Sequence, residues 1–242
     1  LYERYAWGMG SMSSRMIGWF GDGNGYVGNL NLKPEIANTL STTIDWHDPA
    51  GQRWDLKVQP FYTYTHNYIN VVRLGNFTNG LSQLQFVNHN ARSYGINASG
   101  FVRLWNTPHY GHGELTGNIN WVRGQDLVTH SGLYHQMPAN GVVGLHETYE
   151  NWTGRVEVTL VKSKTTVDLL RNEPRTPGYA LLGLGGSSRW NAFTLNASIE
   201  HLLNHDYYLP LGVLSPRNYS AERLLRPPSC LCTSVYRICP RS

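Results

Sequence analysis

Residues 53–64 read RWDLKVQPFYTY, and this stretch decides the fold class. Every second residue from Trp54 to Tyr64 is apolar or aromatic. Polar or charged residues fill the alternate positions at the start of the stretch. Successive side chains of a β-strand point to opposite faces, so a period of two predicts a strand with one apolar and one polar face.

The same alternation recurs along most of the chain, while helical periodicity is nearly absent. Residues 114–122, for example, read ELTGNINWV, with leucine, isoleucine and tryptophan on one parity and glutamate, threonine and asparagine on the other. The expected strands cover residues 36–47, 53–72, 82–105, 113–125, 139–150, 153–169, 179–189 and 192–203. The sequence therefore predicts an all-β fold of about eight antiparallel strands in a meander.

Two settings produce such two-faced strands. A soluble β-sandwich buries the apolar face, whereas a transmembrane β-barrel turns it toward lipid and turns the polar face toward a wet lumen. Strand length favours the barrel, because soluble strands usually run about 5–6 residues and tilted membrane strands need about 9–11. Every expected strand reaches the membrane length.

The connections between the expected strands alternate between short and long, as in outer-membrane barrels, where periplasmic turns are short and outer loops are long. The short connections are residues 48–52, 106–112, 150–152 and 190–191. The long connections are residues 73–81, 126–138 and 170–178. A Greek-key sandwich gives no reason for this regularity, so the connections favour the barrel too.

Five of the eight tryptophans lie at or beside the short connections. They are Trp46, Trp54, Trp105, Trp152 and Trp190. Indole rings favour the boundary between membrane and water. A single tryptophan near a turn would more simply cap a soluble core. Five at one end of the sheet predict an aromatic girdle at the periplasmic interface.

Composition agrees with a two-faced membrane sheet. Of the 242 residues only 15% are charged, 40% are hydrophobic and 12% are aromatic. These values exclude a disordered polyelectrolyte and a coiled coil. The net charge of +4 is mild and its basic residues are scattered, so we expect no nucleic-acid partner. No stretch approaches the roughly 20 apolar residues of a transmembrane helix.

Four motifs carry a family resemblance. They read LNLKPE at residues 30–35, NHNARSYG at 88–95, TPGYALL at 176–182 and EHLLNHDYY at 200–208. In this order and spacing the chain resembles the TonB-dependent outer-membrane receptors over roughly residues 1–212, with His201 where the family usually has asparagine. The resemblance implies the C-terminal portion of a 22-stranded barrel with a plugged lumen in the outer membrane of a Gram-negative bacterium.

The resemblance also implies transport rather than enzyme activity. Such receptors import metal chelates, such as siderophores, or metal ions. The partners expected here are outer-membrane lipid and such a substrate. The inner-membrane TonB complex would be contacted only through a plug that this chain lacks. Because the chain opens on Leu1 without a secretory signal, we expect a fragment of a longer protein.

Residues 213–242 depart from the family pattern. Alternation is lost, prolines appear, and all three cysteines (Cys230, Cys232 and Cys239) lie there. We expect a frameshifted or disordered tail. Half a metal site at Cys230 and Cys232 is the weaker interpretation, because no second pair or nearby histidine completes it.

No catalytic constellation or cofactor motif is present in the sequence, and a metal held between His109 and His112 is less expected than a solvated turn. The candidate ligand-binding residues lie in an outer loop before the first expected strand. They are Trp7, Met9, Met12, Met16, Trp19 and Tyr26. Thioethers select Cu(I), and aromatic rings could stack on an organic chelate. Packing of the loop onto its neighbours is the simpler expectation for these side chains.

Two alternatives stay open. Eight strands could close as a complete small barrel, serving as an adhesin or pore. A soluble β-sandwich with a binding role is disfavoured by strand length, connections and tryptophans. If the chain is a fragment, its sheet has two unpaired edges, and we expect that it does not insert alone as a functional receptor.

Overall fold

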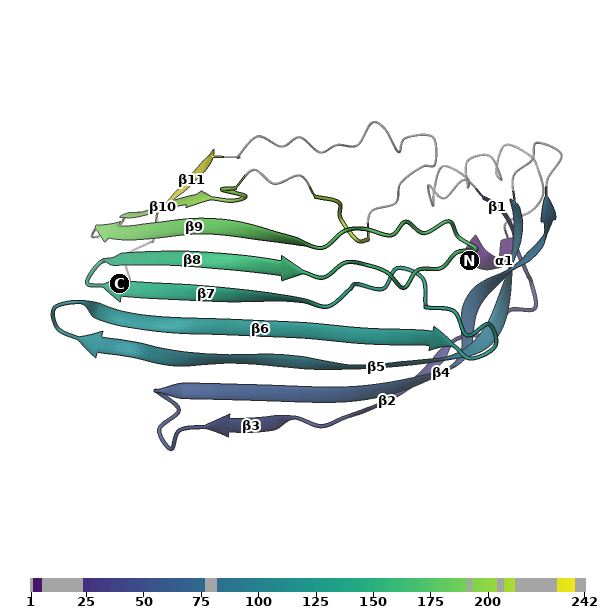
Figure 1. Ribbon diagram of the computed structural model, residues 1–242, viewed down its shortest axis with the longest axis horizontal. Coiled ribbons are helices and arrows are strands. Elements are labelled where there is room, and N and C mark those ends of the chain that lie inside the picture. Colours follow the sequence, from purple (N-terminus) through teal and green to yellow (C-terminus); the bar gives the residue numbers. More distant parts are fainter. Residues whose placement is uncertain are drawn as a thin grey trace.

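The computed structural model describes residues 2–5, 24–76, 82–190, 193–203, 207–211 and 230–237. Almost all regular structure within them is β (Figure 1). The single short helix is α1 (Tyr2–Tyr5). None of the described residues forms a helix long and apolar enough to span a membrane.

The strands follow one another along the chain. They are β1 (Gly25–Val27), β2 (Ile36–Ser41), β3 (Ile44–His47), β4 (Trp54–Asn76), β5 (Ser82–Thr107), β6 (Gly111–Asp126), β7 (Asn140–Tyr149), β8 (Trp152–Val161), β9 (Tyr179–Trp190), β10 (Phe193–Ile199) and β11 (Cys230–Arg237). From β4 to β11 each strand pairs antiparallel with the next, which is a meander. β2 and β3 both pair with β4, and β1 adds a short parallel pairing to β5.

The sheet is open, because its order starts at β11 and finishes at β2 without a ladder between these two strands in the described part of the chain. Figure 1 shows the strands side by side along the long axis, with the short turns at the left end and α1, β1 and the long connections at the right. The predicted all-β meander is confirmed. The connection after β4 covers residues 77–81 and not 73–81, because β4 runs on to Asn76, so it is no longer than the connection at residues 48–53.

Each of the eight expected strands corresponds to an observed one, with two differences. The strand expected over residues 36–47 breaks into β2 and β3 opposite Pro60 of β4. Proline has no N–H to donate to the neighbouring strand. The Pro60 carbonyl still accepts a hydrogen bond from the Thr42 amide, at 3.2 Å.

The second difference lies in the strand expected over residues 153–169, which ends at Val161. From there the chain folds inward, and Lys164 is buried. In the sequence, Lys162 and Lys164 replace the apolar residues found at Val156, Val158 and Leu160, which agrees with the strand ending at Val161.

Within the tail, residues 230–237 form β11 and pair with β10. The prolines of the tail lie outside this segment, so they do not interrupt the ladder. A frameshifted origin of the tail stays a prediction.

β4 and β5 are much longer than a membrane requires, with 23 and 26 residues against the roughly 9–11 of a tilted membrane strand. Their far ends extend beyond the rest of the sheet and carry β1 (Figure 1). The buried hydrophobic cluster is found here and not under the sheet. Its members are Tyr26, Leu32, Val71, Leu84 and Phe86.

Candidate functional site

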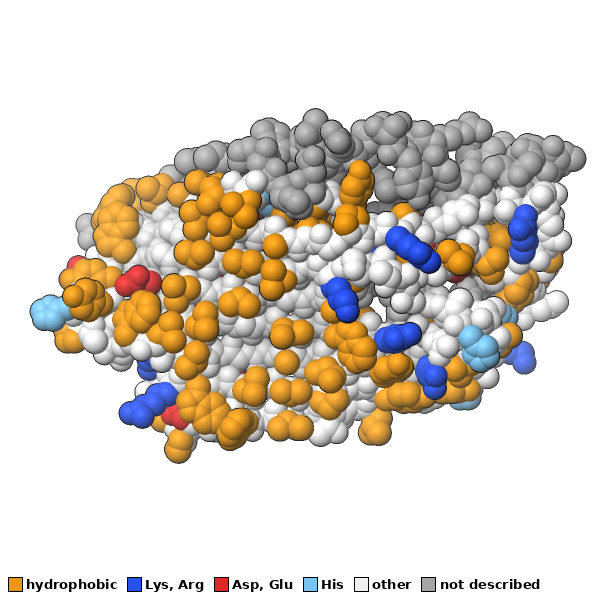
Figure 2. All heavy atoms as spheres, in the orientation of Figure 1, with side chains coloured by type: hydrophobic (Ala, Val, Ile, Leu, Met, Phe, Trp, Pro, Cys, Tyr) orange, Lys and Arg blue, Asp and Glu red, His pale blue; other side chains and the backbone are white. Residues whose placement is uncertain are grey.

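The apolar face of the sheet is uncovered. Strand register places Trp54, Val102, Leu115 and Leu145 in one row across β4 to β7. On β4 to β7, large apolar side chains of this parity are exposed, and the most exposed of them is Ile119 on β6, at 62%. Figure 2 shows hydrophobic side chains spread along the strands of one face. A soluble sandwich would have buried such a face, whereas lipid accepts it.

The opposite face is polar and carries partly exposed ion pairs. One register row holds Arg103, Glu114, His146 and Arg155 from β5 to β8. Glu157, one row further, lies 3.8 Å from His146 and 3.7 Å from Arg155. In the same way Lys57 lies 3.7 Å from Asp45 and 3.6 Å from Asp55. Such a charged, hydrated wall is what the lumen side of an uptake barrel requires.

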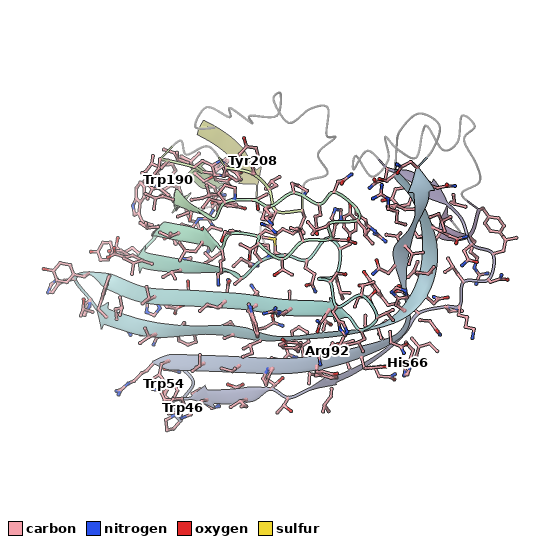
Figure 3. All side chains as sticks on the ribbon, turned by 45° about the vertical axis from the view of Figure 1, so that its right-hand side comes forward. Trp46, Trp54, His66, Arg92, Trp190 and Tyr208 are labelled. Carbon is pink, nitrogen blue, oxygen red and sulfur yellow. The ribbon has the colours of Figure 1, made fainter. Side chains whose placement is uncertain are left out.

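The predicted tryptophans gather at the end of the sheet with the short turns. The Trp46 and Trp54 rings meet edge to face at 5.0 Å, and those of Trp152 and Trp190 at 6.1 Å. Figure 3 shows Trp46, Trp54 and Trp190 at this end. Trp105 lies near the turn at residues 108–110, with its indole over Gly113. A membrane interface at this girdle stays a prediction.

A second aromatic belt lies toward the other end of the apolar face, and the sequence analysis missed it. Tyr62 and Tyr94 share a register row, and the Tyr94 ring meets Trp121 edge to face at 5.8 Å. Just beyond this belt the same parity turns basic, with Arg92 and Arg123. The sequence did carry a signal for this belt, because aromatic residues stand at both ends of the apolar parity of the strands.

Beyond the belt, Asp126 at the end of β6 joins several outer segments. Its side chain is fully buried and lies 2.6 Å from Nδ1 of His89. Asn70 of β4 donates to the same oxygen, while the amides of Val128 and Thr129 donate to the other at 2.7 and 2.9 Å. Burial alone would raise the pKa of Asp126, but these hydrogen bonds outweigh it and hold the pKa below its ordinary value.

A second buried node is the carboxylate of Glu173. It lies 2.6 Å from Nζ of Lys164, and these two side chains are 1% and 2% exposed. The amides of His135 and Asp168 also donate to it, at 2.9 and 2.8 Å. Lys164 donates further to the carbonyl of Pro210 at 2.8 Å. The segments 127–139, 162–178 and 207–211 are thus tied together at one point.

Asp168 and Arg171 flank this node. Burial raises the pKa of the Asp168 carboxyl, and the nearby Arg171 guanidinium opposes that shift. Arg171 also lies over the Tyr134 ring, 4.5 Å from its centre, which again joins the two outer connections. No sequence pattern marks these pairings, because each links residues of separate loops.

The predicted ligand residues fall mostly outside the described residues: Trp7, Met9, Met12, Met16 and Trp19. Tyr26 is described, and its side chain is fully buried and stacked on Phe86 at 5.3 Å. β1 and its neighbours are tied to the 162–178 connection through Asn24, which bonds the Leu170 carbonyl at 3.1 Å. Within the described residues, Tyr26 packs the loop instead of facing a ligand.

No group of three or more histidine, cysteine or carboxylate side chains could hold a metal ion in the described part of the chain. His109 and His112 lie in one short connection, where His112 is 3.6 Å from Glu114.

The sequence profile of the "TonB dependent receptor-like, beta-barrel" family matches residues 1–200. This chain belongs to the TonB-dependent receptor family. A comparison with curated protein sequences finds no significant match.

Solved structures of receptors share the fold of the chain. The copper transporter OprC superposes with a TM-score of 0.66 at 16% identity, covering 76% of this chain and 28% of that one. The ferric enterobactin receptor PfeA of Pseudomonas aeruginosa gives 0.59 at 16% identity, with 78% and 29% covered. The FrpB iron transporter of Neisseria meningitidis gives 0.56 at 12% identity, with 78% and 30% covered.

The chain thus spans less than a third of the length of these receptors. The family and its structural neighbours are transport receptors of the outer membrane and not enzymes, which agrees with the expectation from the sequence. The open sheet is consistent with one part of a larger barrel.

Proposed function

We propose that this receptor chain forms the C-terminal part of an outer-membrane barrel that takes up a metal chelate or metal ion, with energy supplied by the inner-membrane TonB complex through a plug domain. The observation that supports this most is the division of one sheet into an apolar outer face and a charged inner face. The outer connections, joined at Asp126 and Glu173, would form a rigid mouth for substrate capture.

For the substrate we propose a soft metal ion or its chelate, captured with the help of Met9, Met12 and Met16. Three of the four methionines lie within this short stretch. Thioether sulfur is a soft ligand that selects Cu(I) over hard cations. Low-identity structural neighbours include both copper and iron-chelate receptors, so their fold does not choose between the two substrates.

The second candidate is an organic ferric chelate held by stacking on Trp7 and Trp19. Aromatic rings offer flat apolar surfaces to the ring systems of such chelates. This candidate predicts that Met→Leu changes leave uptake intact and Trp→Ala changes abolish it, which is the reverse of the methionine proposal.

The test is uptake by the complete receptor, meaning a closed barrel that contains this chain, in cells lacking other routes. Met9, Met12 and Met16 are changed together to Leu, and the fourth methionine, Met137→Leu, is the matched control. We expect the triple variant to lose copper uptake and the control to keep it. Normal uptake of copper and of every ferric chelate by the triple variant would end the methionine proposal.

A further inference from the structure

We propose that Arg92, Arg123 and Lys162 form a binding site for the phosphate of an outer-leaflet lipid headgroup, on the outside of the barrel. This inference rests on the proposed function only in requiring that the strands span the outer membrane. It concerns the lipid-facing surface and not the path of the transported substrate.

The register places these cations at the outer end of the apolar face, level with the aromatic belt or just beyond it. Arg123 is aligned with Tyr94 of the aromatic belt, and Arg92 lies one apolar-face row further out, aligned with Tyr64. Lys162 follows Val161, the last residue of β8. Val161 is paired with Asn140 of β7, and both have the inward parity. The next residue along β8, Lys162, therefore faces outward. Figure 3 shows Arg92 and His66 on the half of the sheet that lies away from Trp46 and Trp54.

A crevice opens in the sheet at this level. The pairing of β6 with β7 ends at Asn120 and Asn140, although β6 continues to Asp126 along β5. The space left beside the end of β6 is a cavity of about 170 Å³. Its lining includes Trp121, Arg123, Lys162, Ser163, Thr165 and Thr166. Figure 2 shows the surface hollowed there, with Lys and Arg side chains around it.

Arg123 and Lys162 at the crevice, and Arg92 beside them on β5, have no anion of their own. Within the described residues, Arg123 and Lys162 form no ion pair and no side-chain hydrogen bond, and both are exposed. Arg92 donates one bond, at 2.9 Å, to the neutral Gln125 amide. The nearby carboxylates are already engaged: Asp126 by His89 and backbone amides, and Glu173 by Lys164.

A phosphate fits this site better than other occupants. Guanidinium groups bind phosphate through paired charge-assisted hydrogen bonds, ammonium groups do so as point charges, and hydroxyls add neutral donors. Basic groups at the membrane boundary attract anionic headgroups. Tyr94 is aligned with Arg123, and Trp121 lies on the next apolar-face row toward the membrane, so both rings would contact the upper acyl chains or sugar of the same lipid.

The test compares lipid bound to the complete receptor after extraction from outer membranes in mild detergent. Arg92, Arg123 and Lys162 are changed together to Gln. The matched control carries Lys57→Gln, Arg103→Gln and Arg155→Gln, which remove the same charge from the inner face. Co-purified phosphorylated lipid is measured by mass spectrometry and total phosphate. We expect a loss of about tenfold in the outer-face variant and none in the control.

Three other outcomes would each be informative. Equal lipid retention by both variants, in receptors that insert and still take up substrate, would overturn the inference alone. Binding of inorganic phosphate but not of phosphorylated lipid at the three cations would also overturn it. Failure of the wild-type receptor to insert into the outer membrane would overturn the proposed function, and the inference with it.

Discussion

The buried carboxylate of Glu173 offers the sharpest test of the outer loop assembly. Glu173→Gln removes its charge but nearly keeps its volume. The neutral side chain cannot pair with the Lys164 ammonium, which is left buried, and its amide nitrogen would meet the amides of His135 or Asp168, which are also donors. Three hydrogen bonds at one point are therefore lost or weakened together.

The magnitude follows from burial. Removing one partner of a buried ion pair costs about 3–5 kcal/mol, because the remaining charge is uncompensated. Two further charge-assisted bonds, each about 1.5–3 kcal/mol, would raise the sum, but water entering from the nearby surface lowers it. We take about 3 kcal/mol as the free-energy cost of Glu173→Gln. This cost predicts that the outer loop assembly opens locally about a hundred times more often.

The assay is amide hydrogen exchange in the complete receptor, followed at residues 127–139 and 162–178. Glu157→Gln is the matched control, because Glu157 also pairs with cations but its side chain is 36% exposed. Such pairs contribute about 0–1 kcal/mol, so exchange there should change by less than about fivefold. Lys164→Met combined with Glu173→Leu should recover part of the loss. Equal, small effects of Glu173→Gln and Glu157→Gln would refute the reasoning.

Two more predictions concern single side chains. The pKa of Asp126 in the folded chain lies below its ordinary value of 3.8, so its stabilising contribution is present above about pH 4 and is lost as pH falls through the lowered pKa. Pepsin cleavage within residues 127–131 of the wild-type chain should therefore approach that of the Asp126→Asn variant, compared at the same pH, as the pH falls. Gly113→Ala should expel the Trp105 indole, because a Cβ there would lie 2.1 Å from the ring, at a cost of about 1–3 kcal/mol. Tryptophan fluorescence should then shift to the red, whereas Gly154→Ala, in open space on β8, should leave it unchanged.

The sheet could be predicted from the sequence because its information is local. Each strand carries its own alternation, and the stretch around Trp54 already separates an apolar from a polar face. The break opposite Pro60 is also readable, since the missing N–H removes a donor toward the strand on that side, but only once the pairing partner is known.

The outer loop assembly could not be predicted, because its contacts depend on tertiary structure. Asp126 meets His89 and Asn70 across separate strands, and Glu173 meets Lys164 and His135 across separate loops. Nothing in the residues near any one of them marks the partner. Lys164 falls on the apolar parity of Val156, Val158 and Leu160, but nothing near it in the sequence marks its inward turn or its partner.

The central claim is that one parity of each strand faces lipid and the other faces a wet lumen. The most direct measurement places single spin labels at successive positions 114–121 of β6 in the complete receptor, with the native cysteines changed to Ser. We predict that accessibility to oxygen peaks at Leu115, Gly117 and Ile119, while a water-soluble relaxation agent reaches Glu114, Thr116 and Asn118. Accessibility to the water-soluble agent at both parities, or without a period of two, would contradict the account.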